Sequence, residues 1–266
     1  VDMRDNFETI QLERKGDHLL VVTLNRPKAG NSMNTLMGEE LRDLWSGLYC
    51  DQEDVRCAVL TGSGDRIFCA GADLKERNGM TDAQWMAQHA LFEQMIMALM
   101  DCPVPVIAAI NGASYAGGFE MTLGCDFVYA SKTARFALTE VTLGIMPGAC
   151  GTQNLPRAVG VRRAKEIILT GEPISAEQAY EYGIVNKLCE PGSLLEDALA
   201  TAQKICDNAP ISIRQAKKSM SMSQNIDLKS GYMFELEAYN RMVTTEDRVE
   251  GILAYNEKRK AQFKGK

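Results

Sequence analysis

A change of hydrophobic pattern near Pro147 is the feature that most constrains how this 266-residue chain can fold. Before this residue, short apolar or alternating stretches with the two-residue period of β-strands are separated by stretches with helical spacing. After it, the segments have helical spacing. Strands that alternate with helices and are followed by a run of helices predict an α/β core with a helical C-terminal part. The predicted strands are residues 7–14, 18–25, 57–61, 104–110, 127–130 and 134–137.

The predicted helices carry apolar residues at intervals of three and four. Thr81 or Asp82 is suited to cap the helix that follows it. Tyr232, Met233, Phe234 and Tyr239 fall in one late helix, which therefore packs on its own core or on another subunit. The predicted helices are residues 35–51, 82–100, 118–124, 158–169, 176–182, 194–208, 212–223 and 228–242.

The composition excludes several classes of protein. The 29 Lys and Arg residues against 35 Asp and Glu residues give a net charge of −6, which does not favour non-specific binding to nucleic acid. The eight cysteines form no Cys-x-x-Cys pair and only His18 and His89 are present, so we expect reduced thiols and no metal site. The longest apolar stretches are far shorter than the ~20 residues of a membrane-spanning helix, so we expect no membrane association.

The first residues, Val-Asp-Met-Arg-Asp-Asn, lack the apolar core of a secretion signal. We therefore expect a cytoplasmic protein of a bacterium. Position 1 is not Met, so the alternative is a mitochondrial matrix protein from which a transit peptide has been removed.

Two segments rich in small residues can bring backbone N–H groups to a ligand. Residues 67–75 (IFCAGADLK) surround Gly71 with small side chains, and residues 111–120 (NGASYAGGFE) lead from a strand into a Gly pair that opens a helix. Free N–H groups at a helix start bind anions. The phosphate-loop and dinucleotide patterns are both absent, so the candidate anion is one formed during a reaction, such as an enolate oxygen. An ordinary turn and tight helix–sheet packing are the alternative explanations.

Glu120 and Glu140 are two carboxylates with apolar neighbours. A buried Glu is costly unless it is paired or protonated, and two facing carboxylates separate their pKa values into one acid and one base. The alternatives are a helix N-terminal charge for Glu120 and a solvated loop residue for Glu140. Residues 143–153 (LGIMPGACGTQ) follow as a Gly- and Pro-rich loop of the kind that often shapes a pocket.

Together these segments resemble the crotonase superfamily, the enoyl-CoA hydratase/isomerase family. The resemblance extends from Leu24-Asn25-Arg26-Pro27 to Glu257-Lys258-Arg259, and residues 70–77 (AGADLKER) are similar to the methylglutaconyl-CoA hydratase branch. It implies a ββα spiral core with the CoA and catalytic site in residues 1–200. It also implies a helical region in residues 201–266 that assembles a homotrimer or homohexamer. The matching segments are residues 68–75, 117–120, 125–126, 139–140, 143–151 and 171–177.

The resemblance also implies a role for each matched residue. Glu120 and Glu140 match the two catalytic carboxylates of the hydratases, and Ala72 and Gly117 would form an oxyanion hole for the thioester oxygen. Tyr255 and Lys258 match a pair that reaches the CoA of a neighbouring subunit. The other implied contacts to substrate and CoA are Arg26, Ala70, Asp73, Leu74 and Lys75.

The implied reaction is the reversible syn addition of water to a 2-enoyl-CoA, giving the 3-hydroxyacyl-CoA. Two carboxylates can activate the water and recycle its proton, and two N–H donors can stabilise the enolate. This chemistry needs no cofactor beyond the CoA of the substrate. The alternative is an isomerase that moves the double bond between C3 and C2, because the same pair of carboxylates can transfer a proton.

Three further readings carry less support from the sequence. A dehalogenase would need His89 as a nucleophile, but this residue falls on a helical stretch and position 140 is not Asp. RNA binding would depend on the cluster of Arg214, Lys217 and Lys218 and on the basic tail 258–266, in a chain of net charge −6. A non-catalytic scaffold would not require the retained carboxylates and oxyanion positions.

The chain departs from the common family pattern at three positions. Ala116 and Cys150 stand where Gly is common, and Asn154 stands where Arg is common. These positions flank the oxyanion turn and the pocket loop, so we expect them to affect acyl specificity more than reaction type.

Overall fold

The larger of two β-sheets forms the base of the molecule. The computed structural model describes residues 7–52 and 54–266, and its six-stranded sheet has the order β1-β2-β3-β5-β7-β10. β1 pairs antiparallel with β2, and all later pairs are parallel. The strands are β1 (Ile10–Lys15), β2 (Leu19–Leu24), β3 (Cys57–Gly62), β5 (Val106–Ile110), β7 (Phe127–Ser131) and β10 (Lys187–Cys189).

The smaller sheet contains strands of two or three residues, in the order β4-β6-β8-β9. β4, β6 and β8 run parallel, and β9 is antiparallel to β8. Its strands are β4 (Ile67–Cys69), β6 (Ala113–Tyr115), β8 (Arg135–Ala137) and β9 (Ile174–Ser175).

The chain winds between these two sheets in a spiral. It passes from β3 of the larger sheet to β4 of the smaller, returns through helices to β5, and repeats this path through β6 and α4 to β7 and β8. Each turn adds one strand to each sheet. The predicted spiral of ββα units is therefore confirmed.

The helices mostly follow the predicted ranges. The helix expected over 158–169 corresponds to α6 and the last two residues of α5, which are separated because Gly160 adopts φ 79° and ψ 154°, a conformation that breaks a helix and that only Gly adopts readily. The prediction of a loop over 143–153 was wrong at its end, since α5 begins at Gly151. Thr81 caps α3 as predicted, in a reciprocal arrangement with Gln84. The helices are α1 (Thr35–Cys50), α2 (Leu74–Arg77), α3 (Asp82–Asp101), α4 (Gly117–Gly124), α5 (Gly151–Val159), α6 (Val161–Thr170), α7 (Ala176–Glu181), α8 (Leu194–Cys206), α9 (Pro210–Met222), α10 (Leu228–Val243) and α11 (Glu246–Glu257), with short 3-10 helices at Pro27–Ala29 and Glu140–Leu143.

The two faces of the larger sheet are covered separately. Alternate residues of β2, β3 and β5 belong to two different apolar clusters, as the two-residue period requires. Helix α8 covers one face through Leu194, Ala198, Ala202 and Cys206, spaced four residues apart. The domain boundary expected after residue 200 falls inside α8, and this helix packs on the sheet along its length.

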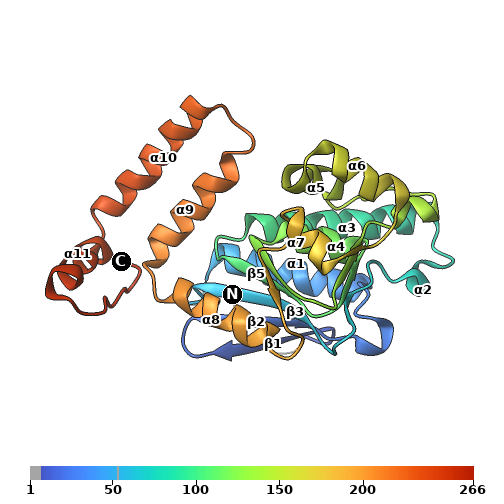
Figure 1. Cartoon of the computed structure of the whole chain (residues 1–266), viewed down its shortest axis with the longest axis horizontal. Coiled ribbons are helices and arrows are strands. Elements are labelled where there is room, and N and C mark those ends of the chain that lie inside the picture. Colours follow the sequence, from blue (N-terminus) through green and yellow to red (C-terminus); the bar gives the residue numbers. More distant parts are fainter. Residues whose placement is uncertain (1–6, 53) are drawn as a thin grey trace.

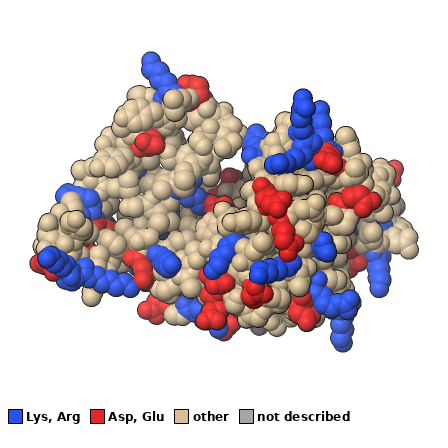
Figure 2. All heavy atoms as spheres, in the orientation of Figure 1, with Lys and Arg blue, Asp and Glu red and all other residues tan. Residues whose placement is uncertain are grey.

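Helices α9, α10 and α11 form an arm that projects beyond α8 (Figure 1). α10 packs on α9, while its large apolar side chains are mostly exposed. On the face drawn in Figure 2, most of the surface of the arm is uncharged.

Most of the cysteines lie in the core. Cys57, Cys69, Cys102, Cys189 and Cys206 are buried, and all eight cysteines are free. Among residues 7–52 and 54–266, no helix is both long and apolar enough to span a membrane. Nor does this part of the chain gather three or more His, Cys, Asp or Glu side chains in a metal-binding cluster.

Candidate active site

One cavity of about 500 Å³ lies where the spiral, α3 and the 143–150 loop meet. Glu120 and Glu140 both line it, and so do Ala72 and Gly117. The fold therefore brings together, from three separate segments, the four residues that were expected to perform the chemistry. The remaining lining residues are Met33, Ala70, Leu74, Arg77, Trp85, His89, Phe92, Met95, Ala116, Thr139, Leu143, Ile145, Met146, Pro147, Gly148 and Ala149.

Glu120 is held by the backbone of the 143–151 loop. Its Oε1 atom accepts hydrogen bonds of 2.8 Å from the N–H groups of both Ala149 and Gly151, and the residue is only 3% exposed. Burial raises the pKa of Glu120, while these amides act in the opposite direction by stabilising the carboxylate. A side chain on Gly151 would place its Cβ 2.7 Å from the same oxygen, so Gly is required there.

Glu140 has a different environment. It starts the 3-10 helix Glu140–Leu143, is 6% exposed, and neither carboxylate oxygen has a hydrogen-bond partner among the described residues. Burial raises the pKa of Glu140 to about 7, and the nearby charge of Glu120 contributes to the rise. The cavity thus contains Glu120, which is hydrogen-bonded to the loop backbone, and Glu140, whose carboxyl group gains or loses its proton near neutral pH.

The raised pKa of Glu140 predicts a cost in stability at alkaline pH. Stability from the buried protonated form is present below the ordinary pKa of 4.5 and is lost as the pH rises through about 7. Gln cannot ionise, so Glu140→Gln should increase the free energy of unfolding by about 2 kcal/mol at pH 8 and change it little at pH 4.5. Urea unfolding at the two pH values measures the difference; an equal effect of the substitution at both would contradict the assignment.

The amides of Ala72 and Gly117 lie at a close contact between two chain segments. A Cβ atom on Gly71 would lie 3.4 Å from Gly117 N, so the segments touch. On its other edge, the segment 71–73 pairs with Met33: the Met33 amide donates to Gly71 O, and Met33 O accepts from the Asp73 amide. Neither the Ala72 nor the Gly117 amide donates to another group in the described part of the chain. Two donors at one cavity wall fit an oxyanion hole.

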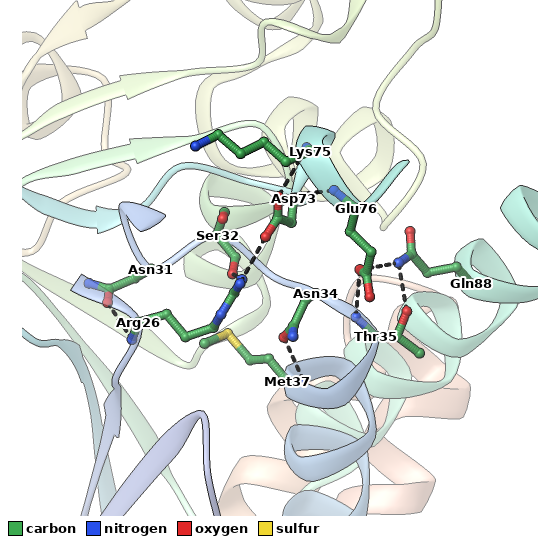
Figure 3. Close-up of polar contacts among 10 residues, drawn as sticks. All are labelled: Arg26, Asn31, Ser32, Asn34, Thr35, Met37, Asp73, Lys75, Glu76 and Gln88. Carbon is green, nitrogen blue, oxygen red and sulfur yellow. Dashed lines mark hydrogen bonds and ion pairs between the residues drawn. The ribbon is translucent and has the colours of Figure 1, made fainter. Parts of the chain in front are cut away.

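Arg26 and Asp73 bind each other at the edge of this wall (Figure 3). Arg26 Nη2 lies 2.9 Å from Asp73 Oδ2, and Nη1 donates to Ser32 O. Asp73 also caps α2 by accepting from the amides of Lys75 and Glu76. Burial acts to raise the pKa of Asp73, but these hydrogen bonds and Arg26 outweigh it and lower the pKa. Both side chains therefore order the turn that presents Ala72.

Comparison with known proteins decides the family. The model for "Enoyl-CoA hydratase/isomerase" matches residues 14–266. The chain belongs to the enoyl-CoA hydratase/isomerase family. YngF of Bacillus subtilis (strain 168), whose name gives both activities, is 40% identical over 97% of this chain and 99% of its own length. The short-chain-enoyl-CoA hydratase of Clostridium acetobutylicum is 38% identical over 96% and 97%.

The fold comparison agrees with the family assignment. The crystal structure of an enoyl-CoA hydratase from Bacillus anthracis superposes with a TM-score of 0.95 at 42% identity. The match covers 97% of this chain and 100% of that one. The crotonase-type spiral expected from the sequence is thereby confirmed.

The other implied contacts are distributed over the molecule. Ala70 and Leu74 line the cavity, whereas the side chain of Lys75 is exposed. Tyr255 is 85% exposed on α11 and Lys258 ends that helix, at the opposite end of the molecule from α2 (Figure 1). One chain does not bring this last pair to its own cavity, and their contact with a neighbouring subunit's CoA stays a prediction.

Two departures from the common family pattern coincide with unusual backbone. Ala116 has φ 49° and ψ −128°, and Cys150 has φ 70° and ψ 8°. The left-handed region favours Gly, and a non-Gly residue at a sparsely populated φ/ψ costs about 1–3 kcal/mol.

We expect Ala116→Gly to stabilise the protein. Relief of strain exceeds the extra chain entropy that Gly loses on folding, so the free energy of unfolding should rise by about 1 kcal/mol. Urea unfolding of the variant gives the value, and a clear loss of stability would mean that the turn at position 116 is not strained.

Sequence reasoning did not single out Trp85 or Phe92 of α3, and it considered His89 only as a nucleophile. Trp85, His89 and Phe92 face it together, with the i, i+4, i+7 spacing of one helix face. This spacing is visible in the sequence and could have identified the three residues as one helix face. The His89 ring packs on the 143–151 loop, because a Cβ on Gly148 would lie 2.5 Å from its Cε1 atom. Arg77 also lines the cavity, although only its neighbours in the AGADLKER segment were expected to.

Proposed function

We propose that this protein hydrates a 2-enoyl-CoA thioester to the 3-hydroxyacyl-CoA. The observation that carries the proposal is the pair Glu120 and Glu140, buried in different environments on one cavity. Two carboxyl groups whose surroundings differ in this way are suited to act as base and acid. The name of the Clostridium acetobutylicum relative, a short-chain-enoyl-CoA hydratase, agrees with this reading.

In the proposed reaction Glu120 acts as the base. Its carboxylate, which accepts hydrogen bonds from the Ala149 and Gly151 amides, takes a proton from water while the water oxygen forms a bond to C3 of the conjugated thioester. The electron pair of the double bond shifts toward the thioester oxygen. The Ala72 and Gly117 amides stabilise the enolate charge there.

Glu140 supplies the second proton. With a pKa of about 7 it is protonated often enough at neutral pH to donate to C2, which collapses the enolate to the saturated thioester. The proton taken up by Glu120 then returns to Glu140 through solvent, so the pair is restored. No metal or cofactor takes part in this proposal beyond the CoA of the substrate.

Hydration and isomerisation can be separated with two substrates. A hydratase removes the conjugated-thioester absorbance of crotonyl-CoA, because water adds across its double bond. An isomerase creates that absorbance from 3-butenoyl-CoA, because the double bond moves into conjugation. We expect turnover of crotonyl-CoA to be much faster; the reverse order would assign the protein as an isomerase.

We also propose that the arm α9–α11 assembles the chain into a homotrimer or homohexamer. Tyr232, Met233, Tyr239 and Ile252 are each more than half exposed on it, a concentration of apolar surface typical of an interface. Sedimentation at micromolar concentration should give a species three or six times the 29.3 kDa chain. A monomer would contradict the assembly.

A further inference from the structure

The basic cluster on α9 separates into three different environments. Lys217 is paired, since its Nζ lies 2.7 Å from Asp126 Oδ2 and also donates to a backbone carbonyl. Lys218 is exposed and lies 5.7 Å from the centroid of the Phe234 ring. Arg214 is half-buried, and no residue in 7–52 or 54–266 accepts a hydrogen bond from it or forms an ion pair with it. A half-buried guanidinium without an acceptor is costly, so Arg214 needs an explanation.

Arg214 lines a hollow of about 180 Å³ where three parts of the chain meet. Arg56, directly before β3, and Lys264, in the basic tail 258–266, line it from the other sides. Arg56 holds the tail against the core, because its two Nη atoms donate to Cys206 O at 3.1 Å and Phe263 O at 2.8 Å. The C-terminus accordingly lies beside the start of α9 (Figure 1). The remaining lining residues are Asp51, Gln52, Asp54, Val55, Pro210 and Gly265.

The two guanidinium groups of this hollow have no carboxylate partner among the described residues. Arg56 donates to backbone carbonyls only. Burial lowers the pKa of Arg214, and the charge of Arg56 lowers it further, so both disfavour its charged form. Asp51 and Asp54 are exposed and form no ion pair with either arginine. The hollow therefore places two positive charges together without an anion between them.

The size and donors of the hollow fit a small oxyanion. Arg214 offers a free fork of N–H donors, which matches two oxygens of a phosphate. Helix α9 starts at Pro210, which lines the hollow, and no side chain caps this start, so the positive end of the helix dipole also favours an anion. The volume is below the ~300–1,000 Å³ of sites for larger organic ligands. A nucleotide therefore does not fit.

We propose that this hollow binds a free phosphate ion and thereby ties α9 and the basic tail to the core. The anion accepts from the fork of Arg214 and offsets the repulsion between Arg214 and Arg56. The exposed Lys264 adds a third cation at the rim. No residue lines both this hollow and the cavity of Glu120 and Glu140, so the proposal is independent of the proposed function.

Calorimetry with inorganic phosphate, in chloride buffer of constant ionic strength, tests the binding. We expect a Kd of about 1 mM or lower, and weaker binding of adenosine monophosphate. Arg214→Gln should weaken phosphate binding about 10- to 100-fold. Lys218→Gln, on the same helix but outside the hollow, is the matched control and should leave the Kd within about twofold. Circular dichroism checks that both variants are folded.

Thermal unfolding separates a binding role of Arg214 from a structural one. In phosphate-free buffer, Arg214→Gln should unfold at the same temperature as wild type or higher, because it removes the repulsion by Arg56. Phosphate at about ten times the Kd should raise the unfolding midpoint of wild type by about 2–4 °C and that of the variant by much less. A residue that only packs against its neighbours would lower the midpoint equally in both buffers.

Hydrogen exchange locates the bound phosphate. Exchange should slow at residues 211–214 and 263–265 and stay unchanged in α10. If Arg214→Gln does not fold, Lys264→Gln, a change at an exposed side chain, should still weaken binding about two- to fivefold. Three results would overturn the proposal: no binding of phosphate to wild type, binding that Arg214→Gln leaves unchanged, or adenosine monophosphate binding more tightly than phosphate.

Discussion

Glu120→Gln should lower kcat for crotonyl-CoA hydration by ~10²–10⁴-fold, because Gln cannot accept the proton of the attacking water. The amide side chain keeps the size of the residue, and its oxygen can still accept from the Ala149 and Gly151 amides. Glu140→Gln should have a loss of the same order, since it removes the proton donor. Stopped-flow loss of thioester absorbance measures both variants.

The two substitutions should not be additive. If both carboxyl groups act on one water and one substrate, the double variant should be little slower than the slower single variant. Glu93→Gln is the control: Glu93 lies on α3, pairs with His89 at the edge of the cavity, and is half exposed. We expect its kcat to stay within about threefold of wild type. Near-normal turnover of both Glu120→Gln and Glu140→Gln would refute the mechanism.

Gly118→Ala should lower kcat by ~10²–10³-fold through the oxyanion hole. A Cβ at position 118 would lie 2.5 Å from Cys69 O and 2.7 Å from Cys69 Cβ. The first turn of α4 must then move away from β4, the strand that leads into Ala72. The Gly117 amide moves with α4, and losing one oxyanion donor has an effect of this size.

Gly124→Ala, at the other end of α4, controls for a general effect on the helix. A Cβ there would make ordinary contacts of 3.5 Å with Ile96 and Leu99. Its kcat should equal that of wild type. Overpacking at position 118 also costs about 1–3 kcal/mol of stability, so urea unfolding must show that the variant is folded during the assay. A folded Gly118→Ala variant with normal kcat would separate α4 from the oxyanion hole.

The sequence predicted the long elements because their periods are clear. β2, β3 and β5 are continuous apolar runs, and α3 has a capping threonine and helical spacing. The smaller sheet was largely missed, since β4 and β6 have three residues each and a two-residue period cannot be read from so few. The break between α5 and α6 depends on one Gly conformation.

The site was predictable where residue type alone carried the chemistry. Glu120 and Glu140 stood out as carboxylates with apolar neighbours, and both are buried on the cavity. The absence of a hydrogen-bond partner for the Glu140 carboxyl group depends on which segments meet in three dimensions. Such absences of contacts have no signature in a linear sequence.

Mixing the wild-type protein with crotonyl-CoA tests the central claim most directly. We expect the conjugated-thioester absorbance to disappear in a reaction whose product has gained the mass of one water, and Glu120→Gln should abolish the loss. Unchanged absorbance across short-chain, branched and dicarboxylic enoyl-CoAs, in a protein that calorimetry shows to bind acyl-CoA, would contradict the assignment of Glu120 and Glu140 as a hydrating pair.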